Sequence, residues 1–261
     1  MAALLRWVLL GLMFSAVCAV QAAEDVRVGA YHFPPYVIKP ESERPGGLLP
    51  ELLQALNQMQ SDYRFSLVAT SAMRRYRDLQ SGRFDLMLFE SPAWGWQDTP
   101  HTALDLRVED AEVYVARRQP GRDEHYFDEF AGKRMALYSG YHYGFAGFNS
   151  DKQFLTHAFN AVLTYSHDSN LIMLLRGRAD VAVVTRSYLR TYQQLYPEQS
   201  SALLVSQRVD QIYQHQALFR LESTIQPHTF ARLLEQLNRD KQLDKLLNRY
   251  HLRDASALIN D

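Results

Sequence analysis

The sequence contains one cysteine, Cys18, and it lies within the first 23 residues. Those residues carry a single charge, Arg6, followed by an apolar run over 7–20 and small residues up to Ala23. This order is typical of a secretory signal peptide, so we expect residues 1–23 to be removed on export. The apolar run is shorter than the ~20 residues of a membrane-spanning helix, which disfavours an uncleaved anchor. The exported chain then has no cysteine, which excludes disulfides and thiol chemistry.

No charge sign dominates the chain. Lys and Arg number 28 against 29 Asp and Glu, and without Arg6 of the leader the balance is 27 − 29 = −2. A near-neutral surface without a basic stripe argues against a nucleic-acid partner, because such partners are held by neutralisation of their phosphates. No second apolar run of ~18 residues follows the leader, so we expect no membrane span there. We therefore expect a protein of the periplasm, exported by its N-terminal signal peptide.

The signals of metal and cofactor chemistry are also missing. Nine histidines are spread along the chain without a His-Glu-x-x-His pattern or any other pair at metal-ligand spacing. A Gly-x-Ser-x-Gly motif is absent, and Gly140, Gly144 and Gly147 surround aromatic residues rather than a phosphate-binding turn. We expect no metal and no cofactor.

Aromatic residues are plentiful, and several gather at one predicted strand end. The run over 26–30 predicts a strand, and the pair Pro34-Pro35 must end it because proline lacks the amide donor that a sheet needs. The rings around that strand end are Tyr31, His32, Phe33 and Tyr36. Ligands lie at the carboxyl ends of strands in open α/β sheets, so this group predicts a binding wall. The alternative is that each ring only fills the edge of a core.

The remaining chain alternates strands and helices twice. The first set comprises strands at 26–30, 63–69 and 84–89 and helices at 48–59 and 72–80. The second set comprises strands at 133–138, 162–165 and 179–184 and helices at 151–161 and 170–175, with Asp151 and either Asp168 or Ser169 as N-caps. Further strands are expected at 112–116, 202–205 and 213–219, a helix at 188–196, and two amphipathic helices within 230–250. Such short connections give parallel sheets with right-handed crossovers, so we predict two α/β lobes.

Three motifs, in this order along the chain, carry a family resemblance. They are Leu79-Gln-Ser-Gly-Arg-Phe-Asp85, Gly132-Lys-Arg-Met-Ala-Leu-Tyr-Ser-Gly140 and Leu174-Leu-Arg-Gly-Arg-Ala-Asp-Val-Ala-Val-Val184. With the strand and Pro-Pro-Tyr36 turn described above, the chain resembles the family 3 extracellular solute-binding proteins over nearly all of its exported length. The resemblance implies a two-lobed periplasmic binding protein fold of type II.

The same resemblance implies how the lobes are divided. Lobe 1 would comprise 24–116 and 212–261, and lobe 2 would comprise 117–211, with two hinge strands near 113–117 and 211–219. Members of this family hold a polar amino acid or a related small solute between the lobes. They deliver it to a membrane transporter or sense it.

Two positions depart from the pattern of the amino-acid-binding members. The loop that usually reads Thr-Pro-Glu-Arg, whose arginine binds the ligand carboxylate, is here Ser91-Pro-Ala-Trp94. An indole cannot supply the two parallel hydrogen bonds of a guanidinium, so the usual carboxylate clamp is missing. The aspartate that usually binds the amino group corresponds to Thr185 or Arg186. We therefore expect a solute other than a standard amino acid held at both charged ends.

Aromatic and hydroxyl residues dominate the predicted ligand site. The predicted ligand-binding residues are Tyr31, Phe33, Tyr36, Ser91, Trp94, Trp96, Ser139, Tyr141, His142, Thr185 and Arg186. The rings are suited to a flat or cationic solute, because aromatic faces attract cations. Alternatively, Arg186 and the amides of Ser139-Gly140 would meet an anion. A third possibility is that the two tryptophans only pack between helices.

The sequence thus predicts a periplasmic protein that captures a small polar or aromatic solute between two lobes for an ABC-type transporter. One alternative is a ligand-sensing protein for a signalling receptor. Another is a cyclohexadienyl-dehydratase-like enzyme on the same fold, with Glu90, His32 or His142 as proton donor. We expect a monomeric non-enzyme whose partners are a small-molecule ligand and an ABC permease or membrane sensor.

Overall fold

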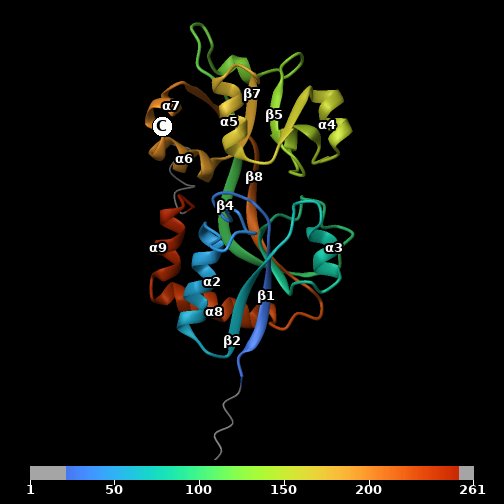
Figure 1. Cartoon of the computed structure of the whole chain (residues 1–261), viewed down its shortest axis with the longest axis vertical. Coiled ribbons are helices and arrows are strands. Elements are labelled where there is room, and N and C mark those ends of the chain that lie inside the picture. Colours follow the sequence, from blue (N-terminus) through green and yellow to red (C-terminus); the bar gives the residue numbers. More distant parts are fainter. Residues whose placement is uncertain (1–21, 253–261) are drawn as a thin grey trace, which may run out of the picture.

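The computed structural model describes residues 22–252, so all but the last two residues of the predicted signal peptide lie outside the described part. Figure 1 shows two lobes, one above the other, joined by two long strands that run from one lobe into the other. These strands are β4 (Thr102–Arg117) and β8 (Leu203–Phe219), which pair antiparallel with each other. The predicted two-lobed α/β architecture with two hinge strands is confirmed. No helix within residues 22–252 is long and apolar enough to cross a membrane.

The first lobe is built on three parallel strands. Its central strand is β1 (Glu24–Ala30), which pairs with β2 (Tyr63–Ala69) on one side and β3 (Leu86–Glu90) on the other. The helices of this lobe are α2 (Leu48–Met59), α3 (Arg75–Gln80), α8 (Pro227–Arg239) and α9 (Gln242–Arg249). The β-α-β-α-β order of the first lobe matches the prediction, and the leucine stripe of α2 is buried as its helical spacing implied.

The start of α2 fixes the aromatic loop that follows β1. The amides of Leu48 and Leu49 donate to the carbonyl oxygens of Pro35 (3.1 Å) and Tyr36 (2.8 Å), which satisfies two donors of the first turn. Gly47 precedes this turn at φ 100°, and a Cβ there would lie 2.6 Å from the Tyr36 carbonyl oxygen. The rings of the loop are therefore held against the end of the sheet by backbone contacts.

The second lobe repeats the plan of the first. Its parallel strands are β5 (Met135–Tyr138), β6 (Ala161–Thr164) and β7 (Val181–Thr185), with β5 in the middle. Its helices are α4 (Lys152–Phe159), α5 (His167–Leu175), α6 (Arg186–Leu195) and α7 (Pro197–Ser201), with short 3-10 turns at Glu124–Phe127 and Gly144–Ala146. Asp151 caps α4 as predicted, whereas Ser166 caps α5 in place of Asp168 or Ser169.

Both hinge strands are longer than the sequence pattern indicated. The strand expected at 112–116 begins at Thr102, and the two strands expected at 202–205 and 213–219 are one continuous strand, β8. The polar stretch over 206–210 shows no strand periodicity, but β4 supplies a partner on both sides of it. Long-range pairing therefore overrides local propensity there. The exact division of the chain into lobes at 116/117 and 211/212 stays a prediction.

A bulge interrupts the β4–β8 pairing between the lobes. Glu112 pairs with Gln211, but the next pair is Val113 with Val209, so Asp210 is an extra residue on β8. The Asp210 carboxylate accepts hydrogen bonds from the amide of Gly144 (2.6 Å) and from the Tyr114 hydroxyl (2.7 Å). The bulge thereby anchors the loop that follows β5.

We predict that Gly144→Ala destabilises the protein by about 1–3 kcal/mol, because the added Cβ would lie 2.5 Å from the backbone oxygen of Asp210. The measurement is the free energy of unfolding in urea. Gly46→Ala is a matched control, since its Cβ would meet Ile38 at an ordinary 3.6 Å, and we expect a change below about 0.5 kcal/mol. Equal effects at the two glycines would contradict the close approach at the bulge.

Candidate ligand-binding site

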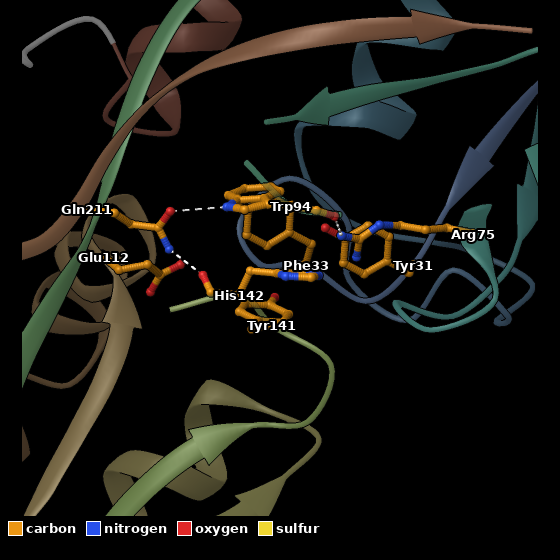
Figure 2. Close-up of a pocket in the computed structure, with 8 residues that line it drawn as sticks. All are labelled: Tyr31, Phe33, Arg75, Trp94, Glu112, Tyr141, His142 and Gln211. Carbon is orange, nitrogen blue, oxygen red and sulfur yellow. Dashed lines mark hydrogen bonds between the residues drawn. The ribbon is translucent and has the colours of Figure 1, made fainter. Parts of the chain in front are cut away.

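A small cavity lies between the lobes, beside the hinge strands. Figure 2 shows the side chains that line it, which are Tyr31, Phe33, Arg75, Trp94, Glu112, Tyr141, His142 and Gln211. They come from the loop after β1, the start of α3, the loop after β3, both hinge strands and the loop after β5. The space left for a water-sized sphere is about 10 Å³, roughly the room for one water molecule. The lobes are therefore closed on their own side chains.

Aromatic rings from both lobes meet at Phe33. Its ring has Trp94 at 5.7 Å and Tyr141 at 5.6 Å between ring centroids, both edge-on, and Tyr31 stacks at 5.7 Å. Edge-to-face and offset contacts at such distances are favourable for aromatic pairs. The rings thus form a continuous wall across the lobe boundary, and of the four rings expected at the end of β1 it includes Tyr31 and Phe33 but not His32 or Tyr36.

Polar contacts also connect the lobes at the cavity. The Gln211 side chain accepts from Trp94 Nε1 (3.1 Å) and donates to the carbonyl oxygen of His142 (2.5 Å). The Tyr138 hydroxyl donates to the carbonyl oxygen of His32 (3.1 Å). The bond between Tyr138 and His32 joins lobe 2 directly to lobe 1 and must break when the lobes separate, whereas Gln211 joins hinge strand β8 to one loop of each lobe.

Arg75 lines the cavity, and its burial is not what its place in a cluster of arginines indicates. The cluster of Arg74, Arg75 and Arg77 has the pattern of a solvated face, but Arg75 is only 1% exposed. Its Nε lies 3.4 Å from Glu90 Oε2, and its guanidinium lies over the rings of Tyr31 and Tyr76, at 4.8 Å from each centroid. A buried arginine needs such a carboxylate and ring contacts to offset its lost hydration.

Glu90 is held in place from behind the wall. Its Oε2 accepts from Trp96 Nε1 at 2.9 Å, and Phe89 before it has φ 64°, a left-handed conformation that turns the strand end. Burial raises the pKa of Glu90, while Arg75 acts in the opposite direction. Trp96, which is 1% exposed, therefore supports the Arg75–Glu90 pair and does not line the cavity.

Five of the predicted ligand residues line the cavity: Tyr31, Phe33, Trp94, Tyr141 and His142. Tyr36 lies behind Phe33, is fully buried and donates to Asp110 Oδ2 at 2.7 Å. Ser139 lines an adjoining hollow of about 340 Å³, which shares Tyr31 with the cavity.

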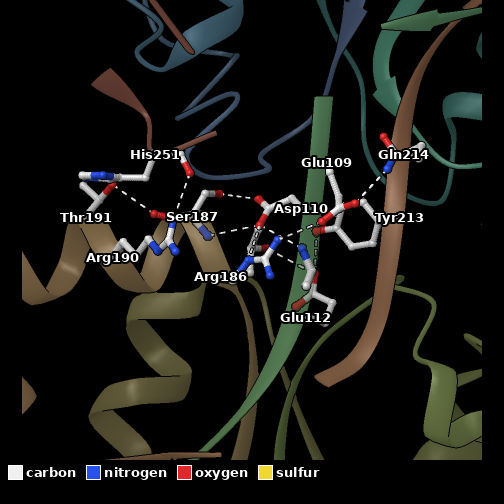
Figure 3. Close-up of polar contacts among 12 residues, drawn as sticks. Glu109, Asp110, Glu112, Arg186, Ser187, Arg190, Thr191, Tyr213, Gln214 and His251 are labelled. Carbon is white, nitrogen blue, oxygen red and sulfur yellow. Dashed lines mark hydrogen bonds and ion pairs between the residues drawn. The ribbon is translucent and has the colours of Figure 1, made fainter. Parts of the chain in front are cut away.

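The other predicted positions lie at the edges of the site. Ser91 is buried in the turn after β3, and the Thr185 hydroxyl donates to Glu112 Oε1 at 3.2 Å. Figure 3 shows Arg186 at the hinge, where its guanidinium lies 3.6 Å from Glu109 and 3.8 Å from Asp110. The structure thus places Arg186 among acids and away from the cavity wall.

Three cavity residues were missed by sequence reasoning: Arg75, Glu112 and Gln211. A signal was present for two of them, because Glu112 and Gln211 are polar residues at or next to the start of the expected hinge strands near 113–117 and 211–219. Arg75 had no local signal that distinguishes it from its exposed neighbours.

His142 connects the cavity to lobe 1 through its ring. Nδ1 lies 2.7 Å from the Phe148 carbonyl oxygen, and Nε2 lies 2.9 Å from the Tyr76 hydroxyl. A carbonyl only accepts, so Nδ1 carries the proton in the neutral ring, while the one proton of the Tyr76 hydroxyl is shared between Nε2 and the carbonyl oxygen of Trp94, which lies nearer at 2.6 Å. Burial lowers the pKa of His142 to about 4. In residues 22–252, no group of three or more His, Cys, Asp or Glu side chains is placed to hold a metal ion.

Comparison with known proteins finds solved structures whose fold is similar to that of this chain. No protein-family model matches the sequence, and no curated protein is similar to it. A mutant of ArgBP from T. maritima has a TM-score of 0.65 at 19% identity, covering 87% of this chain and 95% of that chain. A histidine kinase sensor domain with similarity to periplasmic binding proteins has a TM-score of 0.64 at 17% identity, covering 88% and 96%.

A third solved structure has a similar fold. It is an ancestral amino acid-binding protein described as a precursor of cyclohexadienyl dehydratase, with a TM-score of 0.63 at 16% identity, covering 87% of this chain and 94% of that chain. At these identities the likeness shows the fold, which is that of the type II periplasmic binding proteins. It confirms the fold that the sequence motifs implied.

We predict that Arg75→Met lowers the free energy of unfolding by about 3–5 kcal/mol, because it leaves the Glu90 carboxylate buried without its cation. The double variant Arg75→Met/Glu90→Gln is the control, since a glutamine keeps an acceptor for Trp96 and removes the charge. We expect it to recover at least about half of the loss. A double variant as unstable as the single one, in urea titrations, would refute the charge pairing.

We predict that the free energy of unfolding depends on pH through the titration of His142. Because its pKa is lowered to about 4 in the folded protein against an ordinary 6.5, its contribution to stability is fully present above pH 6.5 and is lost as the pH falls toward 4. The difference in unfolding free energy between the unaltered protein and His142→Gln should shrink over that range, on the order of 1–3 kcal/mol. A difference that stays constant from pH 7 to pH 4 would rule out a neutral, buried His142.

Proposed function

We propose that this chain, which has the fold of the type II periplasmic binding proteins, is a periplasmic solute-binding protein that presents a small polar or aromatic solute to an ABC-type transporter. The observation that supports this most is the wall of rings from both lobes around a cavity at the hinge, centred on Phe33. Rings that meet across a lobe boundary can enclose a solute from two sides. They exclude water and thereby strengthen each polar contact inside.

The solute must enter an open form of the protein. In the closed arrangement the cavity holds about 10 Å³, which is too small for a solute of several heavy atoms. Rotation of the lobes about β4 and β8 would separate Tyr141 from Phe33 and open the wall. A solute then selects the closed form through contacts with both lobes.

A sensing role is the second candidate. One solved structure of this fold is a histidine kinase sensor domain, so the fold occurs in a protein that senses. Both roles use one cleft and one closing motion, and they differ in the membrane partner that reads the closed form. We propose delivery to an ABC permease first, with the exported chain acting as a monomer.

We propose that the protein binds its solute and does not convert it. The enzyme alternative rests on fold analogy with a protein described as a dehydratase precursor. Glu90, one of its three named proton donors beside His32 and His142, is already held by Arg75 and Trp96, which suits a structural role. Full recovery of an unchanged solute after incubation with the protein supports the binding role, and conversion of the solute would support the enzyme.

The experiment is a thermal melt of the purified protein against a few hundred amino acids, amines, organic acids and aromatic metabolites. A ligand at 100 times its dissociation constant adds about 2.7 kcal/mol of stability, which appears as a raised melting temperature. We predict that Trp94→Ala weakens the binding of a hit by about 10-fold or more through loss of ring contacts. Leu221→Ala, at a position 62% exposed, is the control and should leave the affinity unchanged. A folded protein that binds nothing, or unaltered binding in Trp94→Ala, would contradict the proposal.

A further inference from the structure

Glu112 is the acidic residue that lines the cavity from the hinge. It lies on β4 opposite Gln211 of β8, at the pair after which the register slips. The residue is 2% exposed. Figure 2 shows its carboxylate beside the Gln211 side chain and close to His142. Bulges at such places commonly aim a side chain into a site.

The Glu112 carboxylate has few hydrogen-bond partners. Oε1 accepts from the Thr185 hydroxyl at 3.2 Å and from the Tyr213 hydroxyl at 3.5 Å, which is long for a hydrogen bond between oxygens. Oε2 is buried and has no hydrogen-bond partner within residues 22–252. An orphaned carboxylate oxygen is costly in a protein interior, so its retention needs an explanation.

Glu90 Oε1 is likewise buried without a hydrogen-bond partner, so what sets Glu112 apart from the other buried acids is the lack of a cation beside it. The buried acidic residues of the described part are Asp78, Asp85, Glu90, Asp110 and Glu112. The first four each have an arginine nitrogen at 3.1 to 3.8 Å. Glu112 has no such ion pair among residues 22–252, and burial followed by the charges of Asp110 and Asp210 raises its pKa well above the usual range.

The nearby cations are already neutralised. Arg75, on the lobe 1 side of the cavity, faces Glu90, and Arg186 faces Glu109 and Asp110 (Figure 3). With these pairs counted as neutral, the residues that line the cavity keep a surplus of one carboxyl group. An anionic solute, or the carboxylate of a zwitterion, therefore meets no unpaired arginine on this wall.

Rings complete the surroundings of Glu112. Phe33, Trp94 and Tyr141 line the same cavity, and the buried Tyr141 hydroxyl also lacks a hydrogen-bond partner in the described chain. Aromatic faces attract organic cations, and the carboxyl group of Glu112, whose ionised form a neighbouring ammonium ion favours, supplies the opposite point charge. Both features favour a positively charged group at this place.

We propose that Glu112 is a cation subsite of the cleft, which binds the ammonium group of a monocationic organic amine while Phe33, Trp94 and Tyr141 contact its carbon body. This inference rests on the proposed solute-binding function, because the lobes must close on the amine. The cavity accommodates a group about the size of one water molecule, which suits an ammonium. The carbon body requires the more open form of the cleft, in which the three rings separate.

The first test uses the unaltered protein and matched sets of ligands in isothermal titration calorimetry. Propylamine, benzylamine and phenethylamine are compared with their alcohols and with propionate, benzoate and phenylacetate. We expect at least one amine to bind and its neutral and anionic counterparts to bind about 10-fold more weakly or worse, as the loss of a charge-assisted hydrogen bond predicts. Equal affinity of an amine and its alcohol would overturn the cation subsite.

The second test replaces the carboxylate. Glu112→Gln should weaken amine binding about 10-fold or more, and the ligand-free variant should melt at a higher temperature because an unpaired buried acid has been removed. Glu109→Gln, on the same strand but with a side chain 31% exposed, is the control and should keep the amine affinity within about twofold. Unchanged amine binding in Glu112→Gln would overturn the subsite.

The outcomes separate this inference from the proposed function. If an organic acid or a neutral solute binds in the thermal melts and no amine does, the cation subsite fails and solute binding stands. If the folded protein binds no solute at all, both fail. Should Glu112→Gln not fold, the matched ligand sets on the unaltered protein still decide.

Discussion

The pairing of β4 with β8 is the constraint on which the rest of the structure depends. These strands make both connections between the lobes, and they pair from one end, Thr102 with Phe219, to the other, Arg117 with Leu203. Their register slips at three places, between Asp105 and Glu109, between Glu112 and Val113, and between Val113 and Val115 of β4, and such bulges bend a strand locally. Glu112 and Gln211, which line the cavity, form the pair just before the second of these slips.

Closure of the lobes is held from two faces. On the cleft face, Tyr138 and His142 of the second lobe make hydrogen bonds with the first lobe. On the opposite face, Arg190 of α6 donates to the carbonyl oxygen of His251, whose neighbour Tyr250 donates to Glu51 of α2. Each such bond contributes only about 0.5–1.5 kcal/mol net, so a solute with contacts on both lobes is able to shift the balance.

Buried acidic groups have different partners in lobe 1 and at the hinge. In lobe 1, Arg75 and Glu90 neutralise each other and are covered by Tyr31 and Trp96, which makes a rigid wall. At the hinge, Glu112 keeps a carboxyl group with an orphaned oxygen. Removing a charge from water is costly unless a partner replaces the water. Glu90 Oε1 also lacks a hydrogen-bond partner, but Glu90 has the cation of Arg75 beside it, whereas Glu112 has no ion pair in the described part of the chain.

The sequence by itself determined the features that local pattern encodes. Apolar spacing in α2, the strand-ending Pro34-Pro35 pair and the twofold alternation of strands and helices sufficed for two α/β lobes and an aromatic wall at the end of β1. Tertiary structure alone decided the continuity of β8, the bulge at Asp210 and the burial of Arg75. The physical reason is that strand register and charge burial are set by partners far along the chain, such as Glu112 for Gln211 and Glu90 for Arg75, which no short stretch of sequence contains.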